Sequence, residues 1–76
     1  MSLTFLIAHN GTRVQIVYGN LEKLPSVGDS FPRGVLRPEG PWTVTSVFGD
    51  ADQCLMAGLF ADFGEEMVMA ALWRPV

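Results

Sequence analysis

Polar and apolar residues alternate on both sides of an Asn-Gly pair near the start of the chain. Asn10 and Gly11 supply the two positive-φ residues that a tight type I′ turn needs. Folding the chain there predicts the cross-strand pairs His9–Thr12, Ala8–Arg13, Ile7–Val14, Leu6–Gln15, Phe5–Ile16, Thr4–Val17 and Leu3–Tyr18. Alternate pairs then form one apolar and one mixed face, an agreement that a slip of one residue would destroy. The segment therefore predicts a β-hairpin.

Both faces of this hairpin need a cover. The first consists of Leu3, Phe5, Ile7, Val14, Ile16 and Tyr18, and we expect the strand predicted at residues 42–48 to lie over it. The mixed face also carries Leu6, Ala8 and Val17. We expect a neighbouring chain, or the apolar C-terminal segment, to cover that second face.

Turn and strand signals follow along the middle of the chain. Residues 25–31, with the pattern Pro-x-Val-Gly-Asp-x-Phe, resemble the start of a strand in small bacterial barrels, with Val27 and Phe31 pointing inward. Residues 32–41 hold three prolines and two glycines, which predicts a long loop. The β-branched and aromatic residues of 42–48 predict a strand, with one face formed by Trp42, Val44 and Phe48.

The apolar last third of the chain permits two interpretations. In the first, residues 53–61 and 66–74 are strands joined by a four-residue turn, and both of their faces are apolar. In the second, a helix begins at Ala51, with Asp50 as its N-cap and Gln53 as the capping-box partner, and ends at Gly64. Periodicity alone does not separate a strand from a helix in short apolar runs, and the preceding β context favours strands.

These elements predict a single small all-β domain over residues 1–76, a five- or six-stranded barrel of SH3-like or similar type. The strands are expected at residues 3–9, 12–18, 27–31, 42–48, 53–61 and 66–74. The alternative is an α+β domain, in which a helix over residues 51–62 packs on an antiparallel sheet.

Composition indicates a domain that is not built to stand alone. A chain of 76 residues buries only about 60% of the surface that its unfolded form exposes. One cysteine and one histidine exclude an internal disulfide and a thiolate metal cluster, and we expect no cofactor. With 49% hydrophobic and 17% charged residues, apolar surface remains after a small core is filled. We therefore expect a homo-oligomer or a protein partner.

Charge is spread unevenly along the chain. Four basic against two acidic residues give residues 1–37 a net charge of +2, whereas one basic against six acidic residues gives residues 38–76 a net charge of −5. These are either two ordinary solvated faces or a basic and an acidic end that favour head-to-tail contact or a partner chosen by charge. Five scattered cations in an acidic chain argue against binding of duplex nucleic acid.

The sequence also bears on the compartment. A single cysteine and the lack of a signal peptide predict a cytoplasmic protein. Apolar runs of about eight residues fall far short of the roughly 20 that span a bilayer, so no membrane association is expected.

The long loop carries the best candidate for a ligand site. Arg33 and Arg37 lie four residues apart and close to Trp42. Two guanidinium groups can hold a carboxylate or phosphate in bidentate fashion, and an adjacent indole can stack on a ring. The simpler interpretation is that both arginines are solvated and that Trp42 belongs to the core. Under the first interpretation, the loop predicts a small anionic ligand as a partner.

Other chemically capable residues lack the neighbours that catalysis needs. His9 flanks a turn without an acid nearby in the sequence, and Cys54 lies in an apolar run next to acids only. The pair Asp50 and Asp52 has the one-residue gap of a calcium loop without its other ligands. The chain contains no glycine-rich phosphate loop and no nucleophile elbow.

Three functional hypotheses follow. The first is a non-catalytic binding or protein-interaction module, a homo-oligomer, without catalytic residues. The second is an oligomeric small-ligand binder or enzyme whose anion site lies at a subunit junction and uses Arg33, Arg37 and Trp42. The third is an acidic inhibitor that mimics nucleic acid through the carboxylates of residues 50–66.

Overall fold

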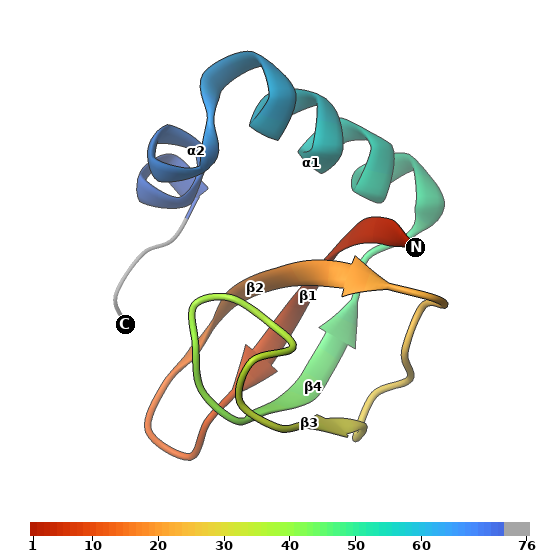
Figure 1. The fold of residues 1–76 in the computed structure, drawn as a ribbon, viewed down its shortest axis with the longest axis vertical. Helices are drawn as coiled ribbons and strands as arrows, with labels where there is room; N and C mark the ends of the chain where they lie inside the picture. Colours follow the sequence, from red (N-terminus) through yellow and green to blue (C-terminus); the bar gives the residue numbers. More distant parts are fainter. Residues whose placement is uncertain (73–76) are drawn as a thin grey trace.

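Within residues 1–72, the part that the computed structural model describes, the chain forms four strands followed by two helices. The elements are β1 (Ser2–His9), β2 (Val14–Leu21), β3 (Ser30–Phe31), β4 (Trp42–Val47), α1 (Asp50–Phe63) and α2 (Glu65–Leu72). Figure 1 shows both helices on one side of the sheet. The protein is an α+β domain, so the preferred prediction of an all-β barrel is wrong and the α+β alternative describes its class.

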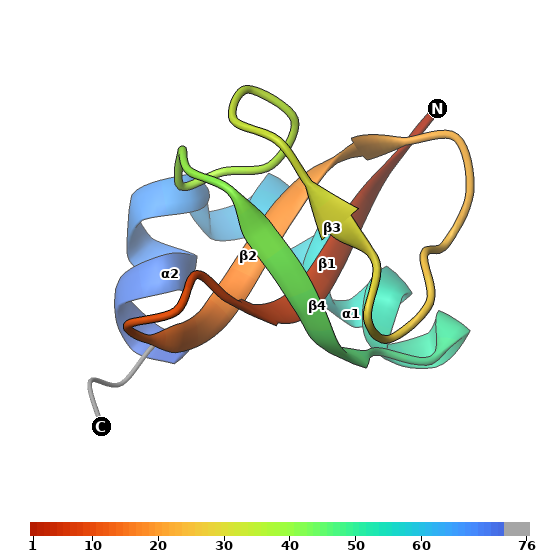
Figure 2. The ribbon, with the colours of Figure 1, turned by 90° about the horizontal axis from the view of Figure 1, so that it is seen from below.

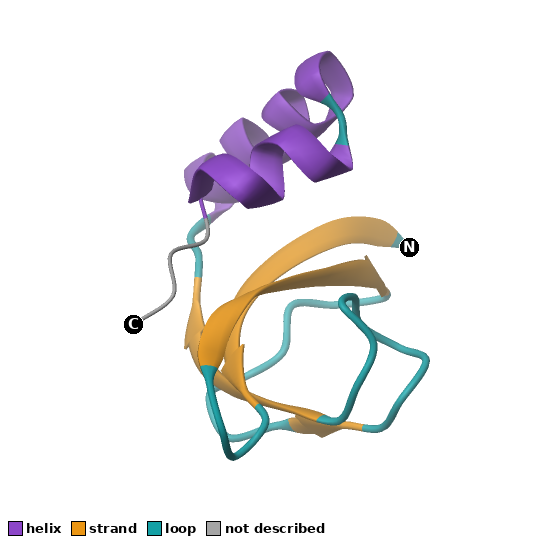
Figure 3. Cartoon of the chain, turned by 90° about the vertical axis from the view of Figure 1, so that its left-hand side faces the viewer, coloured by secondary structure: helices purple, strands orange, loops and turns teal. Residues whose placement is uncertain are grey.

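The strands form an antiparallel sheet in the order β2-β1-β4-β3. The sheet curls into half a barrel, which gives it an inner face enclosed by the strands and an outer face under the helices (Figure 3). Figure 2 shows β1 between β2 and β4, with the helices behind them. Two hydrophobic cores follow from this arrangement, one on each face of the sheet.

The first hairpin forms, but its register differs from the predicted one. His9 pairs with Val14 instead of Thr12, so four residues rather than two connect the strands. Asn10 does not have the positive φ that a type I′ turn requires, and its Oδ1 accepts hydrogen bonds from the amides of Thr12 and Arg13 at 3.1 and 3.2 Å. Because the register moves by two residues, every side chain keeps its predicted face.

The mixed face of the hairpin points into the half-barrel. The inner core consists of Leu6, Ala8, Val17, Leu21, Leu36, Trp42 and Val44. Its cover comes from β4 and from the loop of residues 32–41, which supplies Leu36. The expectation that a neighbouring chain or the C-terminal segment covers this face is therefore wrong.

A β-bulge in β4 changes which of its residues face inward. Thr45 has no partner in the pairing of β4 with β1, and its hydroxyl donates a hydrogen bond to the Ile7 carbonyl at 2.9 Å. The extra residue reverses the alternation of side chains. Val47 therefore packs against the inner core, and Phe48 packs against the outer one, so Phe48 does not share a face with Trp42 as predicted.

The apolar face of the hairpin lies under the helices. Phe5 and Tyr18 form the outer core with Met56 of α1 and Val68 of α2. The ring of Phe60 stands edge-on to both hairpin aromatics, with centroid distances of 4.9 Å to each. The prediction that residues 42–48 cover this face is wrong, because the helical last third provides the cover.

The strands predicted at 53–61 and 66–74 are helical as far as residue 72, and residues 73 and 74 lie outside the described part. Both segments are rich in Ala, Leu and Met, which favour helix. Apolar residues three and four positions apart reach the outer core on one side of α1, so the segment does not need a second apolar layer.

The ends of α1 agree only in part with the helical alternative. Gly49 is the N-cap and no side chain caps the helix, so the predicted capping roles of Asp50 and Gln53 are wrong. Gly64 ends the helix as the alternative expects, with a φ of 84° and an amide that donates to the Phe60 carbonyl at 2.9 Å.

Residues 25–31 form a tight turn and a very short strand. Asp29 closes the turn, because its Oδ2 accepts from the Ser26 amide at 2.9 Å and its own amide donates to the Ser26 carbonyl at 3.1 Å. Val27 lies at the tip and is 65% exposed, so the prediction that it points inward is wrong. Phe31 is half-buried against the inner core, as predicted.

Candidate functional site

The loop of residues 32–41, here called the arginine loop, is fixed to β2 at one point. Arg37 exchanges two backbone hydrogen bonds with Tyr18, of 2.9 and 2.8 Å. Beside it, Gly19 lets the loop come close: a Cβ at this position would lie 2.7 Å from the Val35 carbonyl oxygen. Leu36 enters the inner core, and the loop therefore crosses the sheet at a defined place.

The structure separates the three predicted ligand-binding residues. Arg33 and Arg37 are exposed, whereas Trp42 is 1% exposed and belongs to the inner core. The Trp42 Nε1 donates to the Pro38 carbonyl at 2.7 Å, so the indole holds the arginine loop in place and presents no face to a ligand. Anion binding by the two arginines stays a prediction.

Tyr18 connects the arginine loop to α2. Burial raises the pKa of its hydroxyl to about 12, and the nearby Glu65 carboxylate, which hydrogen-bonds with it, acts in the same direction. Arg37 acts on the same hydroxyl in the opposite direction and lowers the pKa. Where the sheet, the arginine loop and α2 meet, the neutral phenol of Tyr18 thus lies between the carboxylate of Glu65 and the guanidinium group of Arg37.

A hollow lies at the junction of the two helices. It is lined by Phe63, Gly64, Glu65, Glu66, Met67 and Ala70, and is called the helix hollow below. Phe63 and Met67 are 57% and 61% exposed, which is unusual for two large apolar side chains beside one another. The sequence pattern did not indicate this surface, because the preferred prediction places both residues in a strand hairpin. In the helical alternative, the exposure of these two side chains depends on which face of each helix packs on the sheet, and the sequence does not show this.

The tip of the arginine loop has the opposite character. Val35 is 39% exposed and lies in sequence between Arg33 and Arg37. The molecule therefore carries an apolar surface among carboxylates and an apolar side chain among guanidinium groups. The charges that flank the two apolar surfaces are opposite in sign, and the two surfaces lie on different elements of the fold.

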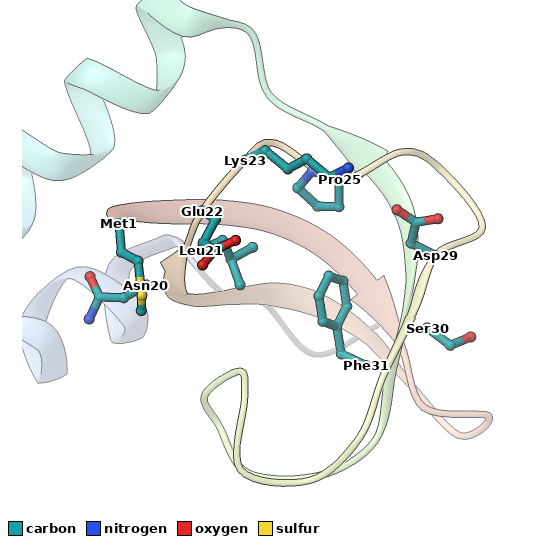
Figure 4. Close-up of a pocket in the computed structure, with 9 residues that line it drawn as sticks. All are labelled: Met1, Asn20, Leu21, Glu22, Lys23, Pro25, Asp29, Ser30 and Phe31. Carbon is teal, nitrogen blue, oxygen red and sulfur yellow. The ribbon is translucent and has the colours of Figure 1, made fainter.

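A pocket of about 460 Å³ opens at the mouth of the half-barrel. Figure 4 shows Leu21 and Phe31 on its inner side, with Asn20 and Ser30 on opposite walls. Lys23 and Asp29 bring charges of both signs to the rim. The sequence signal for this pocket was the 25–31 pattern, which located a turn and a strand start without indicating a site.

Among residues 1–72, the other candidates acquire no catalytic neighbours. His9 lines a cavity of about 350 Å³ whose other lining residues include no acid or base. Cys54 is an exposed free cysteine on α1. Among residues 1–72, no group of three or more His, Cys, Asp or Glu side chains is arranged to hold a metal ion.

Comparison of the chain with protein-family models, with curated proteins and with solved structures finds no match. Within the described residues, neither helix has the length and hydropathy needed to cross a membrane.

Proposed function

We propose that this protein is a non-catalytic interaction module that associates with itself head to tail. In this arrangement the arginine loop of one copy docks in the helix hollow of the next. The observation that carries the proposal is the presence of two exposed apolar surfaces on one chain whose flanking charges are opposite.

Charge supports the direction of docking. Residues 50–72 contain five carboxylates and no lysine or arginine, and Glu65 and Glu66 line the helix hollow itself. The arginine loop carries Arg33 and Arg37 against a single acid, Glu39. Because Arg37 and Glu65 already act on the Tyr18 hydroxyl of their own copy, the charges assigned to the contact between copies are those of Arg33 and Glu66. Opposite charges around a docking site accelerate association and exclude like-charged partners. Two helix hollows facing one another would instead place carboxylates against carboxylates.

Apolar burial supports the contact itself. Val35 is the exposed apolar side chain between the arginines, and Phe63 with Met67 offers it an apolar seat. Removing apolar surface from water is favourable by about 25 cal/mol per Å², and it is the dominant favourable term in most protein association. The charges then select the partner while the apolar contact supplies affinity.

The two surfaces differ, so the contact is heterologous. A heterologous interface generates a closed ring or an open filament, rather than a two-fold dimer. An open assembly would keep one free loop at one end and one free hollow at the other until a ring closes.

The test uses one variant for each surface. Val35→Asp puts a carboxylate on the loop tip opposite an acidic hollow, and the double substitution Phe63→Ser with Met67→Ser removes the apolar seat. Light scattering and sedimentation velocity should show wild-type oligomers that grow with concentration, and monomers for each variant alone. A mixture of the two variants should form dimers that do not grow, because each variant retains one functional surface.

Matched control variants separate a specific loss of docking from the general effect of changing an exposed apolar residue. Val27→Asp and Leu55→Ser alter apolar side chains that are 65% and 61% exposed outside both surfaces, and they should leave association unchanged. A wild-type protein that remains monomeric at about 1 mM overturns the proposal. Monomers in the variant mixture would also overturn the head-to-tail arrangement.

A further inference from the structure

We infer that a pocket at the outer edge of β2 binds the primary ammonium group of a small ligand with a short apolar chain, through the side chain of Gln15. The pocket has a volume of about 360 Å³ and lies between β2, the arginine loop and α2. It shares Glu65, Glu66 and Ala70 with the helix hollow, whereas Gln15 does not line the hollow. The inference does not depend on self-association.

The side-chain amide of Gln15 is buried without the partners that a buried amide needs. The residue is 7% exposed, and its Nε2 reaches only the Ile16 carbonyl, at 3.5 Å. An ordinary hydrogen bond of this kind measures about 2.7–3.2 Å. The Gln15 Oε1 has no partner among residues 1–72. Because nearly all buried polar side chains are hydrogen-bonded, a free acceptor that lines a pocket indicates a ligand that donates to it.

The chain's other glutamine provides the comparison. Both polar atoms of the Gln53 amide are hydrogen-bonded to the backbone of Phe5. Gln53 is only half-buried, whereas Gln15 is buried. Burial makes a missing hydrogen bond more costly, so the fold on its own would favour an apolar residue at position 15.

The position of Gln15 on the strand brings its amide to the pocket. Tyr18 exchanges backbone hydrogen bonds with Arg37 at the outer edge of β2, so Ile16, two residues earlier, turns its carbonyl to the same edge. The contact of the Gln15 Nε2 with that carbonyl places the amide at the edge of the strand. This is where the strand, the arginine loop and α2 line the pocket.

The charges of the lining favour a cation that carries N–H donors. Glu65 and Glu66 contribute two carboxylates, against one guanidinium group from Arg13. A carboxylate has about four acceptor sites, so Glu65 can bond a ligand in addition to the Tyr18 hydroxyl. An ammonium group has three donors, which Gln15 Oε1 and the carboxylates can accept, whereas an anion would meet a net negative lining.

The rest of the lining favours a short apolar chain. Pro38 of the arginine loop and Met69 of α2 both line the pocket, and Met69 also packs against the outer core. A methionine side chain adapts its shape to what it contacts. The volume is near the lower end of the range of about 300–1,000 Å³ that is usual for ligand pockets, which limits the ligand to a few carbon atoms. Short aliphatic amines and small amino acids share this chemistry.

The experiment is a titration of the ¹⁵N-labelled chain with 3-methylbutylamine, which follows the side-chain amide signals of the two glutamines. We expect the Gln15 signals to shift saturably and the Gln53 signals to stay in place, because Gln53 remains bonded to Phe5. The quaternary analogue, 3-methylbutyl-trimethylammonium, keeps the charge and the chain without any N–H. It should bind at least about tenfold more weakly, because it cannot donate to Gln15.

Leucine distinguishes the two sources of the ammonium group, because it adds a carboxylate next to the ammonium group. Tighter binding of leucine than of 3-methylbutylamine identifies an amino acid as the ligand, since Arg13 can pair with its carboxylate. Weaker binding of leucine identifies a free amine.

Variants of the lining locate the site. Gln15→Met removes the amide at nearly the same volume and should weaken binding at least about tenfold. It should not lower the midpoint of thermal unfolding of the free protein, because no good hydrogen bond is lost. Glu65→Gln should weaken binding, whereas Asp62→Asn removes an exposed carboxylate outside the pocket and should leave binding unchanged. This second pair decides the question if Gln15→Met does not fold.

Three results would overturn the inference. The first is the absence of a shift of the Gln15 signals with both 3-methylbutylamine and leucine at millimolar concentration. The second is equal binding of the primary and the quaternary amine, which would mean that charge alone is responsible. The third is undiminished binding by Gln15→Met, which would place the ammonium group elsewhere.

Discussion

The side-chain amide of Gln53 hydrogen-bonds both backbone groups of Phe5. Its Oε1 accepts from the Phe5 amide at 2.8 Å, and its Nε2 donates to the Phe5 carbonyl at 2.7 Å. The pairing of β1 with β4 ends at Leu6 and Val47, so β4 offers no partner to Phe5. The side chain of Gln53, in the first turn of α1, thus takes the place of a neighbouring strand at Phe5. This contact sets where the helix lies on the outer face.

Replacing Gln53 with leucine should destabilise the fold strongly. The substitution leaves one donor and one acceptor of Phe5 without partners under the helix, and each such group costs about 1–3 kcal/mol. We expect a loss of about 2–4 kcal/mol in the free energy of unfolding, measured by urea denaturation. Asp52→Ala, one residue away on an exposed position, should change it little. A Gln53→Leu protein as stable as wild type would show that the two bonds contribute nothing net.

The first hairpin shows how far a local pattern determines structure. The alternation of apolar residues assigned each side chain to the correct face, because burial on both faces fixes the parity of the register. It did not fix the connection, since Asn10 can close a turn either through its backbone or through its side chain. The bulge at Thr45 was likewise invisible, because it depends on a bond to Ile7, which is distant in sequence.

The last third shows where local pattern fails. Its residues are apolar on more than one side, which fits either a doubly buried strand or a helix. The decisive interactions are long-range: Gln53 bonds to Phe5, and Phe60 packs on Phe5 and Tyr18. The exposed pair Phe63 and Met67 becomes recognisable as a surface only after this packing is known.

The candidate site was predictable only in part. The glycines and prolines of residues 32–41 correctly indicated a loop, and both arginines are exposed on it. The role of Trp42 depended on whether its indole found a buried acceptor, and the Pro38 carbonyl provides one. The side-chain oxygen of Gln15, which has no partner among residues 1–72, leaves no signal in the sequence, because its surroundings depend on how the arginine loop and α2 meet at the edge of β2.

Substitution of Gly19 by alanine should loosen the arginine loop. The new methyl group would lie 2.7 Å from the Val35 carbonyl oxygen, which is backbone and cannot rotate away. Overpacking of this kind costs about 1–3 kcal/mol, and we expect that loss in thermal or chemical unfolding. Gly58→Ala is the matched control, for which we expect the opposite sign. A Cβ at Gly58 would meet no atom within 4 Å, and because the residue lies inside α1, alanine should stabilise the fold by about 0.5–1 kcal/mol. Equal effects of the two substitutions would contradict the close approach.

Stability should fall at alkaline pH because of Tyr18. Its pKa is about 12 in the folded protein against an ordinary value of 10.0, so the fold favours the neutral phenol. This stabilisation is complete below pH 10 and is lost as the pH rises through 12, by about 2–3 kcal/mol. Tyr18 is the only tyrosine, so absorbance at the phenolate band reports its titration directly. Tyr18→Phe should remove this part of the pH dependence, and Glu65→Gln should lower the pKa of Tyr18.

Head-to-tail association should weaken with salt. The charges around the arginine loop and the helix hollow are exposed, and the Debye length falls from about 10 Å at 0.1 M to about 3 Å at 1 M. We expect the dissociation constant of wild type to rise roughly five- to tenfold over that range, measured by sedimentation equilibrium. Arg33→Ser should weaken association at low salt and flatten this dependence, because it removes a charge while keeping Val35. Association that strengthens with salt would mean that the apolar contact acts without help from the carboxylates of the hollow.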